Sequence, residues 1–397
     1  MSPIVSEPAI VRLSHGAALA MAITSGLLAA NLYYAQPVVA LIGQDLGMPP
    51  ALESLIVTAA QIGYALGLVL LVPLGDVVEN RRLILASMGA CILGLVGLAL
   101  APAAGWLFVA TLLVGLTSVG AQMIVPLAAH FAAPSERGRI VGNIMTGLLG
   151  GILLARPLSS FVAGLVGWRA IFWISAALLL VLAAIGSRVF PERRPGHRQS
   201  YGALIASLAG LLRMQPVLRR RAIIHAALFA SFALFWTGAP LLLLGEPFHL
   251  SPQAIAVFAL SGALGVLAAP VAGRLADRGH TRAGTVGALL LAAAAMALAL
   301  VASHSLAALV IAGILLDLGV QANLVIGQRE IFLLDGTIRN RLNAVFMSTF
   351  FLGGALGSAL TSPLIEAFGW HAVALLGALF PLAALAYFLF GERRRAR

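Results

Sequence analysis

The chain has 397 residues, of which 61% are hydrophobic and only 10% are charged, and its formal net charge is +11. Because a soluble domain carries about 25% charged residues, this composition excludes a water-soluble protein and indicates that lipid covers most of the surface. The single cysteine, Cys91, excludes a disulfide within the chain and is expected to be a small core residue.

Long apolar stretches follow one another along the chain, and each predicts a membrane-spanning helix. In chain order they include Ala17–Ile42, Leu55–Leu74, Leu83–Ala101, Trp106–Ala129, Ile171–Ile185, Ala222–Leu244, Ala254–Val271, Leu289–Ala302, Leu306–Ile326 and Ala372–Phe390. Most approach the roughly 20 residues that a helix needs to cross about 30 Å of hydrocarbon. Because a backbone in lipid must satisfy its own hydrogen bonds, we expect an all-α membrane protein with about twelve spans.

The basic residues are all arginine, and they occur in alternate loops. These loops carry Arg81 and Arg82, Arg137 and Arg139, the stretch from Arg188 to Arg221, Arg274, Arg278 and Arg282, Arg339 and Arg341, and the tail Arg393 to Arg395. The loops between them are nearly free of arginine. This pattern follows the positive-inside rule and predicts a bacterial inner-membrane protein with both termini in the cytoplasm. It also argues against nucleic acid as a partner.

The second half of the chain repeats the first at an offset of about 202 residues. Arg137 matches Arg339, Gly151 matches Gly353, and the pair Gly167-Trp168 matches Gly369-Trp370. Such a repeat predicts two six-helix bundles, residues 1–188 and 219–397, related by a pseudo-twofold axis. Residues 189–218 form the predicted cytoplasmic linker, in which 201–212 is expected to be an amphipathic helix. The solute site of such a protein lies between the halves, near the midplane.

One loop in each half carries an acidic residue followed by arginines. The second-half loop reads Gly273-Arg-Leu-Ala-Asp277-Arg278-Gly279-His280 and resembles the signature loop of the major facilitator superfamily, G-x-L-A-D-R-x-G-R-R. The first-half loop keeps Asp76, Arg81 and Arg82. The resemblance implies that these side chains latch the halves through charge-assisted hydrogen bonds that break during transport. The alternative is a charge cluster that only sets topology.

Three further segments carry a narrower resemblance. Asn31-Leu-Tyr-Tyr-Ala-Gln-Pro37, Gly147–Arg156 and Leu315–Asn323 are similar to the drug–proton antiporter group, near its nucleoside-exporter-like branch. The fourth span has Gln122 but lacks the arginine that is frequent there, and Arg156-Pro157 stands in place of G-P-x-x-G-G. The resemblance implies proton-coupled export of a small organic solute or drug by alternating access. Spans one, four, seven and ten are then expected to line the cavity.

Two charged residues lie at bilayer depth, where a charge is costly and is therefore a functional candidate. Arg156 and Asp317 are both expected near the middle of their spans. We hypothesise that Asp317 carries the coupled proton and that Arg156 binds an anionic group or modulates that acid. Alternating proximity of the two groups would load and release a proton. The alternatives are a static buried pair and an acid capped by helix hydroxyls.

Polar and aromatic residues of the spans are further candidates for the cavity lining. They are Asn31, Tyr33, Tyr34, Gln36, Gln61, Tyr64, Gln122, Trp236, Thr237, Gln321 and Asn323. Pro37 is expected to bend the first span. Aromatic rings and amides together suit a planar, partly apolar solute. Tyr34 and Trp236 have an alternative role as interfacial anchors, and the amides as helix–helix contacts. His225, beside Arg219–Arg221, is expected at the interface.

Motifs for other chemistries are missing from the sequence. It contains no G-x-x-x-x-G-K-[ST] loop for ATP, no H-E-x-x-H metal motif and no G-x-S-x-G nucleophile turn. We therefore expect a transporter rather than an enzyme, with the proton gradient as energy source, no cofactor and no metal. The expected partners are a small-molecule substrate and the bilayer, and the two halves suffice in a monomer. The alternatives are a proton-coupled uptake symporter and, from another class, a non-transporting membrane sensor or intramembrane enzyme.

Overall fold

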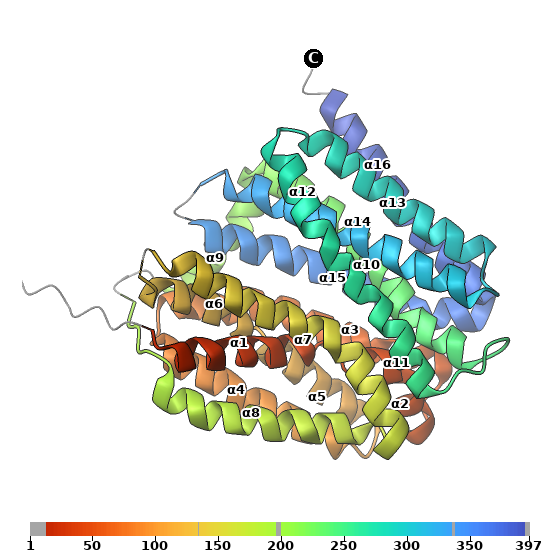
Figure 1. Ribbon diagram of the computed structural model, residues 1–397, viewed down its shortest axis with the longest axis horizontal. Helices are drawn as coiled ribbons and strands as arrows, with labels where there is room; N and C mark the ends of the chain where they lie inside the picture. The colour runs from red at the N-terminus through yellow and green to blue at the C-terminus, as the bar shows by residue number, and fades with distance from the viewer. Residues whose placement is uncertain (1–12, 134, 196–199, 336–337, 394–397) are drawn as a thin grey trace, which may run out of the picture.

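The protein is described by a computed structural model that covers residues 13–133, 135–195, 200–335 and 338–393. Residues 196–199 of the predicted linker and the tail arginines Arg394 and Arg395 lie outside this part of the chain. Within it, all regular structure is helical. Figure 1 shows the first half of the chain, from red to yellow-green, packed below the second half, from green to blue.

The N-terminal half contains six spans, several of which are built from more than one helical segment. Its elements are α1 (His15–Ala30), η1 (Gln36–Val38), α2 (Val39–Asp45), η2 (Pro50–Leu52), α3 (Leu55–Leu70), η3 (Val72–Asp76), α4 (Asn80–Ala99), α5 (Ala104–Thr117), α6 (Gly120–Phe131), α7 (Arg137–Val166) and α8 (Arg169–Val189). The connection to the second half contains α9 (Tyr201–Met214), the amphipathic helix expected from the sequence.

The C-terminal half repeats this arrangement. Its elements are α10 (Pro216–Leu244), α11 (Pro252–Leu260), η4 (Ser261–Leu267), α12 (Ala268–Asp277), α13 (Thr281–Val301), α14 (Leu306–Phe332), α15 (Arg339–Phe368) and α16 (Trp370–Arg393). In the described residues, eleven helical segments are long and apolar enough to cross a membrane. The first span, α1 with η1 and α2, is the twelfth, which gives two six-helix bundles related by a pseudo-twofold axis.

The first span is not the continuous helix that its apolar run suggests. Residues 31–35 form turns and bends between α1 and η1. Pro37 explains this break, because it lacks an N–H and its ring clashes with the carbonyl four residues earlier, that of Tyr33. The turn leaves buried backbone groups without helical partners, and the Ser159 hydroxyl donates to the Tyr34 carbonyl at 2.6 Å.

Closely packed glycines join the helices at the centre of each half. A Cβ on Gly151 of α7 would overlap the backbone of Gly26 on α1, and a Cβ on Gly353 of α15 would overlap the backbone of Ala226 on α10. Small residues allow such backbone contact in membranes, where no hydrophobic effect drives helices together. Since Gly151 and Gly353 are repeat mates, the same contact builds both halves.

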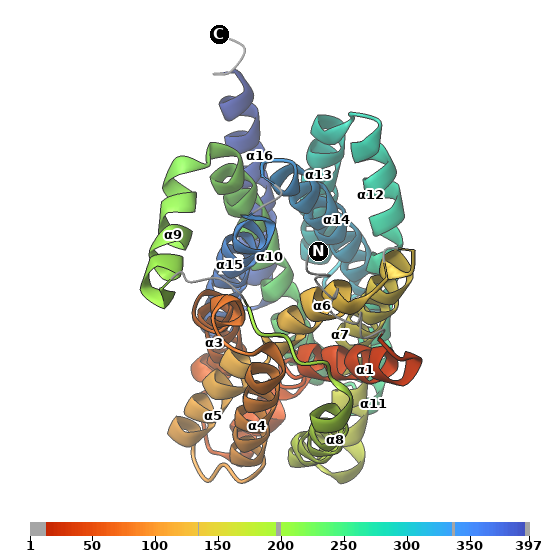
Figure 2. The same ribbon diagram turned by 90° about the vertical axis from the view of Figure 1, so that its left-hand side faces the viewer.

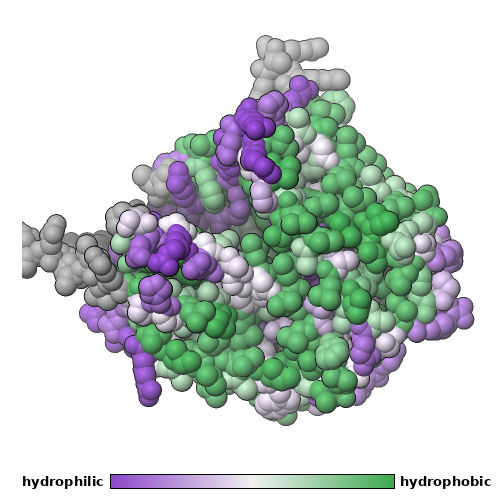
Figure 3. Space-filling view, in the orientation of Figure 1, coloured by the Kyte–Doolittle hydropathy of each residue, from purple (hydrophilic) through white to green (hydrophobic). Residues whose placement is uncertain are grey.

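The surface matches a protein that lies in lipid. Figure 3 shows hydrophobic side chains across the middle of the visible face and hydrophilic side chains gathered mainly at its ends. One end carries the loops with Arg81, Arg139 and Arg341, and we call it the arginine-rich end. It faces the viewer in Figure 2. The loops at the opposite, arginine-poor end join α4 to α5 and α13 to α14.

Candidate binding site between the two halves

The Arg156 side chain lies deep inside the protein, at the contact between the halves. Only 5% of the residue is exposed. Its Nε donates to Gln36 Oε1 at 2.7 Å, while its Nη2 is buried without a hydrogen-bond partner. Three aromatic rings surround the guanidinium, with centroids 4.9 Å (Tyr33), 5.0 Å (Phe232) and 4.9 Å (Trp236) from Cζ. Cation–π attraction therefore replaces part of the hydration that Arg156 has lost.

The Asp317 carboxyl group contacts the N–H edge of the Trp236 ring. The indole Nε1 of Trp236 donates to Asp317 Oδ1 at 2.9 Å, and the residue is 5% exposed. The backbone of η4 packs directly against it. A Cβ on Gly262 would stand 2.6 Å from Asp317 Oδ2, and one on Gly265 would stand 2.5 Å from Asp317 Cβ. Only glycines leave room for a carboxyl group at this position, so η4 and Trp236 together fix its place.

Arg156 and Asp317 do not form an ion pair with each other, although both are described in full. Trp236 contacts both: its ring faces the Arg156 guanidinium and its N–H binds the Asp317 carboxyl. Arg156 and Asp317 are thus not in direct contact in this conformation, and whether they form a static pair stays a prediction. The hydroxyl-capped acid is wrong, since the donor is an indole.

Gln36 connects the two halves at the same level. Its amide accepts from Arg156 and donates from Nε2 to Thr237 Oγ1 at 3.1 Å. We define the central cluster as Tyr33, Gln36 and Arg156 from the N-terminal half and Phe232, Trp236, Thr237 and Asp317 from the C-terminal half. The structure thus brings six of the sequence candidates together. It adds Phe232, which lies one helical turn before Trp236 on α10 and which that spacing would have identified.

Asn31 of the first span contacts two other helices of its own half. Asn31 accepts from Ser175 Oγ at 2.6 Å and donates to Cys91 Sγ at 3.5 Å, so it joins α1 to α8 and α4.

Tyr34 is 3% exposed and Trp236 is 1% exposed. Their alternative interpretation as interfacial anchors is therefore wrong, because an anchor must reach the membrane surface.

Candidates in the second and fourth spans form a connected path. Gln122 Nε2 donates to the Tyr64 hydroxyl at 3.0 Å, and the Tyr64 ring lies 4.5 Å from that of Phe351. Phe351 contacts Phe229 at 5.5 Å, and Phe229 stacks on Phe232 of the central cluster at 5.0 Å. We call Tyr64, Phe229 and Phe351 the aromatic layer. Gln61, whose Oε1 is buried without a partner, faces α15 beside this layer.

The tenth span places its two amides differently. Asn323 Nδ2 lies 2.9 Å from His225 Nδ1, inside the C-terminal half. His225 is fully buried and stacks on Phe350 and Phe346, with centroids 4.8 Å and 5.5 Å away. His225 therefore packs among aromatic side chains of its own half, and its depth in the membrane stays a prediction. Gln321 is partly exposed and lies one helical turn after Asp317 on α14.

A cavity of about 400 Å³ opens between the halves at the arginine-rich end. Its wall includes Asp76, Asn80 and Gln122 from the first half and Gln328, Arg339 and Arg341 from the second. Arg156 and Asp317 are not in its lining. The aromatic layer connects Gln122 on the wall to the cluster, so we place it between the two. The cavity therefore stops short of the central cluster.

The arginine-poor end is closed by hydrogen bonds between the halves. Ser54 and Ser362 bond reciprocally, each backbone N–H donating to the other hydroxyl at 3.1 Å. The hydroxyls of Thr58 and Ser358 are 2.9 Å apart. Ser160 Oγ donates to the carbonyl of Pro252 at 2.6 Å. The conformation is thus closed at one end and open at the other.

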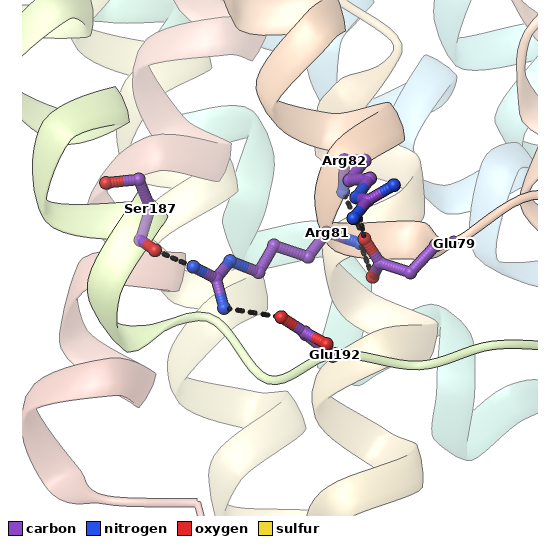
Figure 4. Close-up of polar contacts among 5 residues, drawn as sticks. All are labelled: Glu79, Arg81, Arg82, Ser187 and Glu192. Carbon is purple, nitrogen blue, oxygen red and sulfur yellow. Dashed lines mark hydrogen bonds and ion pairs between the residues drawn. The ribbon is translucent and has the colours of Figure 1, made fainter.

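The contacts that the structure shows for the loop residues expected to latch the halves lie within a half or reach the linker. Figure 4 shows Arg81 bonded to the Ser187 carbonyl and to Glu192 at 3.3 Å, while Glu79 accepts from the backbone of Arg81 and Arg82. In the second half, Asp277 accepts from Arg329 at 3.1 Å. Asp76 lies on the cavity wall, Arg278 is exposed, and Gly273 has open space around it. A latch between the halves therefore stays a prediction for another conformation.

Sequence comparisons identify a family over most of the chain. The family model described as Major Facilitator Superfamily matches residues 21–331. A similar relative is "Putative uncharacterized transporter YgaY" of Escherichia coli (strain K12), 38% identical over 375 residues, which cover 94% of this chain and 95% of the relative. Another is "Probable transporter SCO4007" of Streptomyces coelicolor, 33% identical over 354 residues, which cover 89% and 82%.

Solved structures share the same architecture. A single-residue mutant of the nucleoside transporter NupG superposes with a TM-score of 0.76 at 15% identity, covering 94% of this chain and 98% of that one. A POT family transporter superposes with a TM-score of 0.74, also at 15% identity, covering 94% and 96%. At such identity the likeness concerns the fold alone. The family match and the relatives, together with twelve spans in two similar bundles, show that this chain belongs to the major facilitator superfamily of secondary transporters.

Proposed function

We propose that this protein is a proton-coupled transporter of a small organic solute, with Asp317 as the group that binds the coupled proton. It acts as a monomer in the bacterial inner membrane, without a cofactor, and its arginine-rich end and both termini face the cytoplasm. The asymmetry of the arginines supports this orientation. The open cavity then faces the cytoplasm, and the two halves rock about the central cluster to expose it to either side in turn.

The main support for the proposal is the position of Asp317, whose buried carboxyl group lies at the contact between the two halves. Asp317 has one neutral donor, Trp236, and no ion-pair partner among the described residues. A carboxyl group with so few partners exchanges a proton readily when its surroundings change, since burial favours the neutral acid and a nearby cation favours the carboxylate. Movement of the halves alters the distance from Asp317 to Arg156, because the two residues belong to different halves.

Two modes of coupling follow, and they differ in the charge of the solute. The resemblance to drug–proton antiporters supports export by antiport, in which the solute and the proton compete for the site. The second mode is uptake by symport, in which they bind together. The unpartnered Nη2 of Arg156 favours this second mode, because it offers an anion a binding position and leaves Asp317 free to take a proton.

The test uses purified protein in proteoliposomes. A screen for solutes that raise the melting temperature supplies a ligand, and its flux is then followed with a pH-sensitive dye inside the vesicles. We expect flux to respond to an imposed pH gradient and Asp317→Asn to abolish that response. The control is Glu136→Gln, which alters a surface ion pair with Arg139 and should leave flux unchanged. Unchanged pH-driven flux in Asp317→Asn would remove Asp317 from the coupling role.

The dye also separates the two modes. Solute added outside the vesicles moves protons outward in antiport and inward in symport. A flux that moves no protons in either direction contradicts proton coupling, although it leaves transport itself intact.

A further inference from the structure

We infer that the solute of the central cluster is an organic monoanion with a flat, apolar body, which places its carboxylate on Arg156 and its body against the aromatic rings. This inference rests on the proposed function, because it assigns the ligand class of the same site. It goes beyond that function by fixing the charge and shape of the solute, and with them the direction in which the coupled proton moves.

The first step concerns the unused donor of Arg156. A guanidinium has five N–H groups in a rigid fork, and Arg156 uses Nε on Gln36 while Nη2, fully enclosed, has no acceptor. A buried charged donor without an acceptor is unfavourable, so the site favours a ligand that supplies one. A carboxylate matches the geometry of the fork better than any neutral oxygen.

The second step excludes Asp317 as the missing acceptor. Its Oδ1 accepts from Trp236, and its Oδ2 and Cβ lie against Gly262 and Gly265. Trp236 packs its ring against the Arg156 guanidinium and donates its N–H to Asp317, so the two charged groups are linked through this side chain and form no ion pair. Other carboxylates of the described residues form no ion pair with Arg156. The acceptor therefore comes from outside the chain.

The third step concerns the shape of the solute. Tyr33, Phe232 and Trp236 surround the guanidinium at about the same distance, 4.9–5.0 Å. Tyr33 belongs to one half and the other two rings to the other half, so separation of the halves opens a space with aromatic walls. Flat apolar groups stack well on such walls. Besides the two charged residues, the cluster offers few polar groups, namely Gln36, Thr237 and the Tyr33 hydroxyl, so a polyhydroxylated solute would lose more hydration than it regains.

The fourth step concerns the net charge of the central cluster with the solute bound. The charged or titratable groups that face the cluster are Arg156 from α7, Asp317 from α14 and the Tyr33 hydroxyl from the first span, while α10 and η4 contribute only neutral groups. With Asp317 ionised the cluster is neutral, and a bound anion would leave one uncompensated negative charge in a buried site. A proton on Asp317 removes that charge. The anion and the proton therefore bind together, which is the symport sense of coupling.

Calorimetry with purified protein tests the ligand class without relying on transport. The probes are benzoate, 2-naphthoate and cyclohexanecarboxylate, each paired with its carboxamide, together with benzylammonium and acetate. We expect at least one carboxylate to bind ten times or more tightly than its amide, than acetate and than benzylammonium. We expect Arg156→Gln to remove this preference. Arg156→Lys should retain part of it, because the charge remains but the fork is lost.

The proton count comes from the same titrations repeated in buffers of different ionisation enthalpy. Binding of the carboxylate should take up close to one proton in the wild type and none in Asp317→Asn. The inference is overturned if all three amides bind as well as their acids, if no carboxylate binds, if benzylammonium binds best, or if Arg156→Gln keeps the preference. The comparison of acid with amide in the wild type needs no variant, so misfolding of Arg156→Gln does not affect it. Binding without flux in vesicles would contradict the proposed function and leave the ligand class supported.

Discussion

Removal of the reciprocal bonds between Ser54 and Ser362 should open the arginine-poor end. Each backbone N–H of this pair donates to the other residue's hydroxyl, so the double substitution Ser54→Ala and Ser362→Ala deletes both acceptors. A buried hydrogen bond contributes about 1 kcal/mol net. Two of them amount to about 2 kcal/mol, which shifts the ratio of closed to open molecules by about 30-fold. The Thr58–Ser358 bond remains, so we expect a mixture rather than complete opening.

The distance between spin labels measures this shift directly. Labels at Ala103→Cys and His304→Cys stand on exposed loops of the two halves at the arginine-poor end, in a background with Cys91→Ser. The double alanine variant should add a population at longer distance that is minor in the parent protein. Each single variant should give an intermediate effect.

The matched control removes a buried hydrogen bond that lies within one half. Ser231→Ala deletes the bond from Ser231 Oγ to the Gly377 carbonyl at 2.7 Å, which joins α10 to α16. It should lower the melting temperature without changing the distance distribution. If the double variant and Ser231→Ala give the same distribution as the parent protein, the serine pair does not close this end and our account of the conformation is wrong.

Two further substitutions test the packing and the charge of the fold. Gly265→Ala places a methyl group 2.5 Å from Asp317 Cβ and should cost about 1–3 kcal/mol in a thermal unfolding assay, whereas Gly273→Ala meets nothing within 4 Å and should be neutral or slightly stabilising; equal melting temperatures would contradict the close contact. At the arginine-poor end, the hydrogen bond from Arg169 lowers the pKa of Asp45 below its ordinary 3.8. The contact therefore stabilises the folded state above that value and is lost as the pH falls through the lowered pKa. Asp45→Asn should lower the melting temperature by a few degrees at most at pH 7, because an exposed ion pair contributes little, and this difference should shrink as the pH falls through the lowered pKa of Asp45.

The architecture was predictable because it depends on long-range averages of the sequence. Apolar runs, alternating arginines and a repeat of about 202 residues each extend over the whole chain, and the two-bundle fold is confirmed by the helices and by the family match. The break at residues 31–35 was predicted only as a bend. Pro37 indicates that the helix is perturbed, but the length of the break depends on partners such as Ser159 on α7, which the local sequence does not reveal.

The charged residues of the site were predictable, because a charge at bilayer depth is energetically costly. Arg156 and Asp317 stand out because a charge at bilayer depth needs a reason, and the structure places both at the contact between the halves. Their relation to each other was not predictable. Whether two buried charges pair depends on the side chains packed around both, and here Trp236 contacts each of them.

The burial of His225 among aromatic rings was not predictable from its neighbours in the sequence. Its neighbours Arg219–Arg221 suggest a membrane boundary, yet α10 already begins at Pro216 and the arginines are part of its first turns. The Arg220 side chain extends to the Phe388 carbonyl, and Arg221 reaches Glu330 at 3.7 Å. Long side chains of this kind satisfy their charges at a distance from their own backbone. The presence of an arginine in the sequence is therefore a poor guide to the depth of its backbone in the membrane.

The bonds that close the arginine-poor end have a strength that suits a transporter. The Ser54–Ser362 pair, Thr58–Ser358 and Ser160–Pro252 give four hydrogen bonds between the halves. At about 1 kcal/mol each they contribute about 4 kcal/mol, and about 5.5 kcal/mol of differential binding moves a two-state equilibrium from 1:99 to 99:1. A ligand carboxylate on the free N–H of Arg156, together with a proton on Asp317, is in a position to supply free energy of this order. Because these bonds are few and individually weak, a ligand of this kind can shift the equilibrium between the closed and the open arrangement of this end.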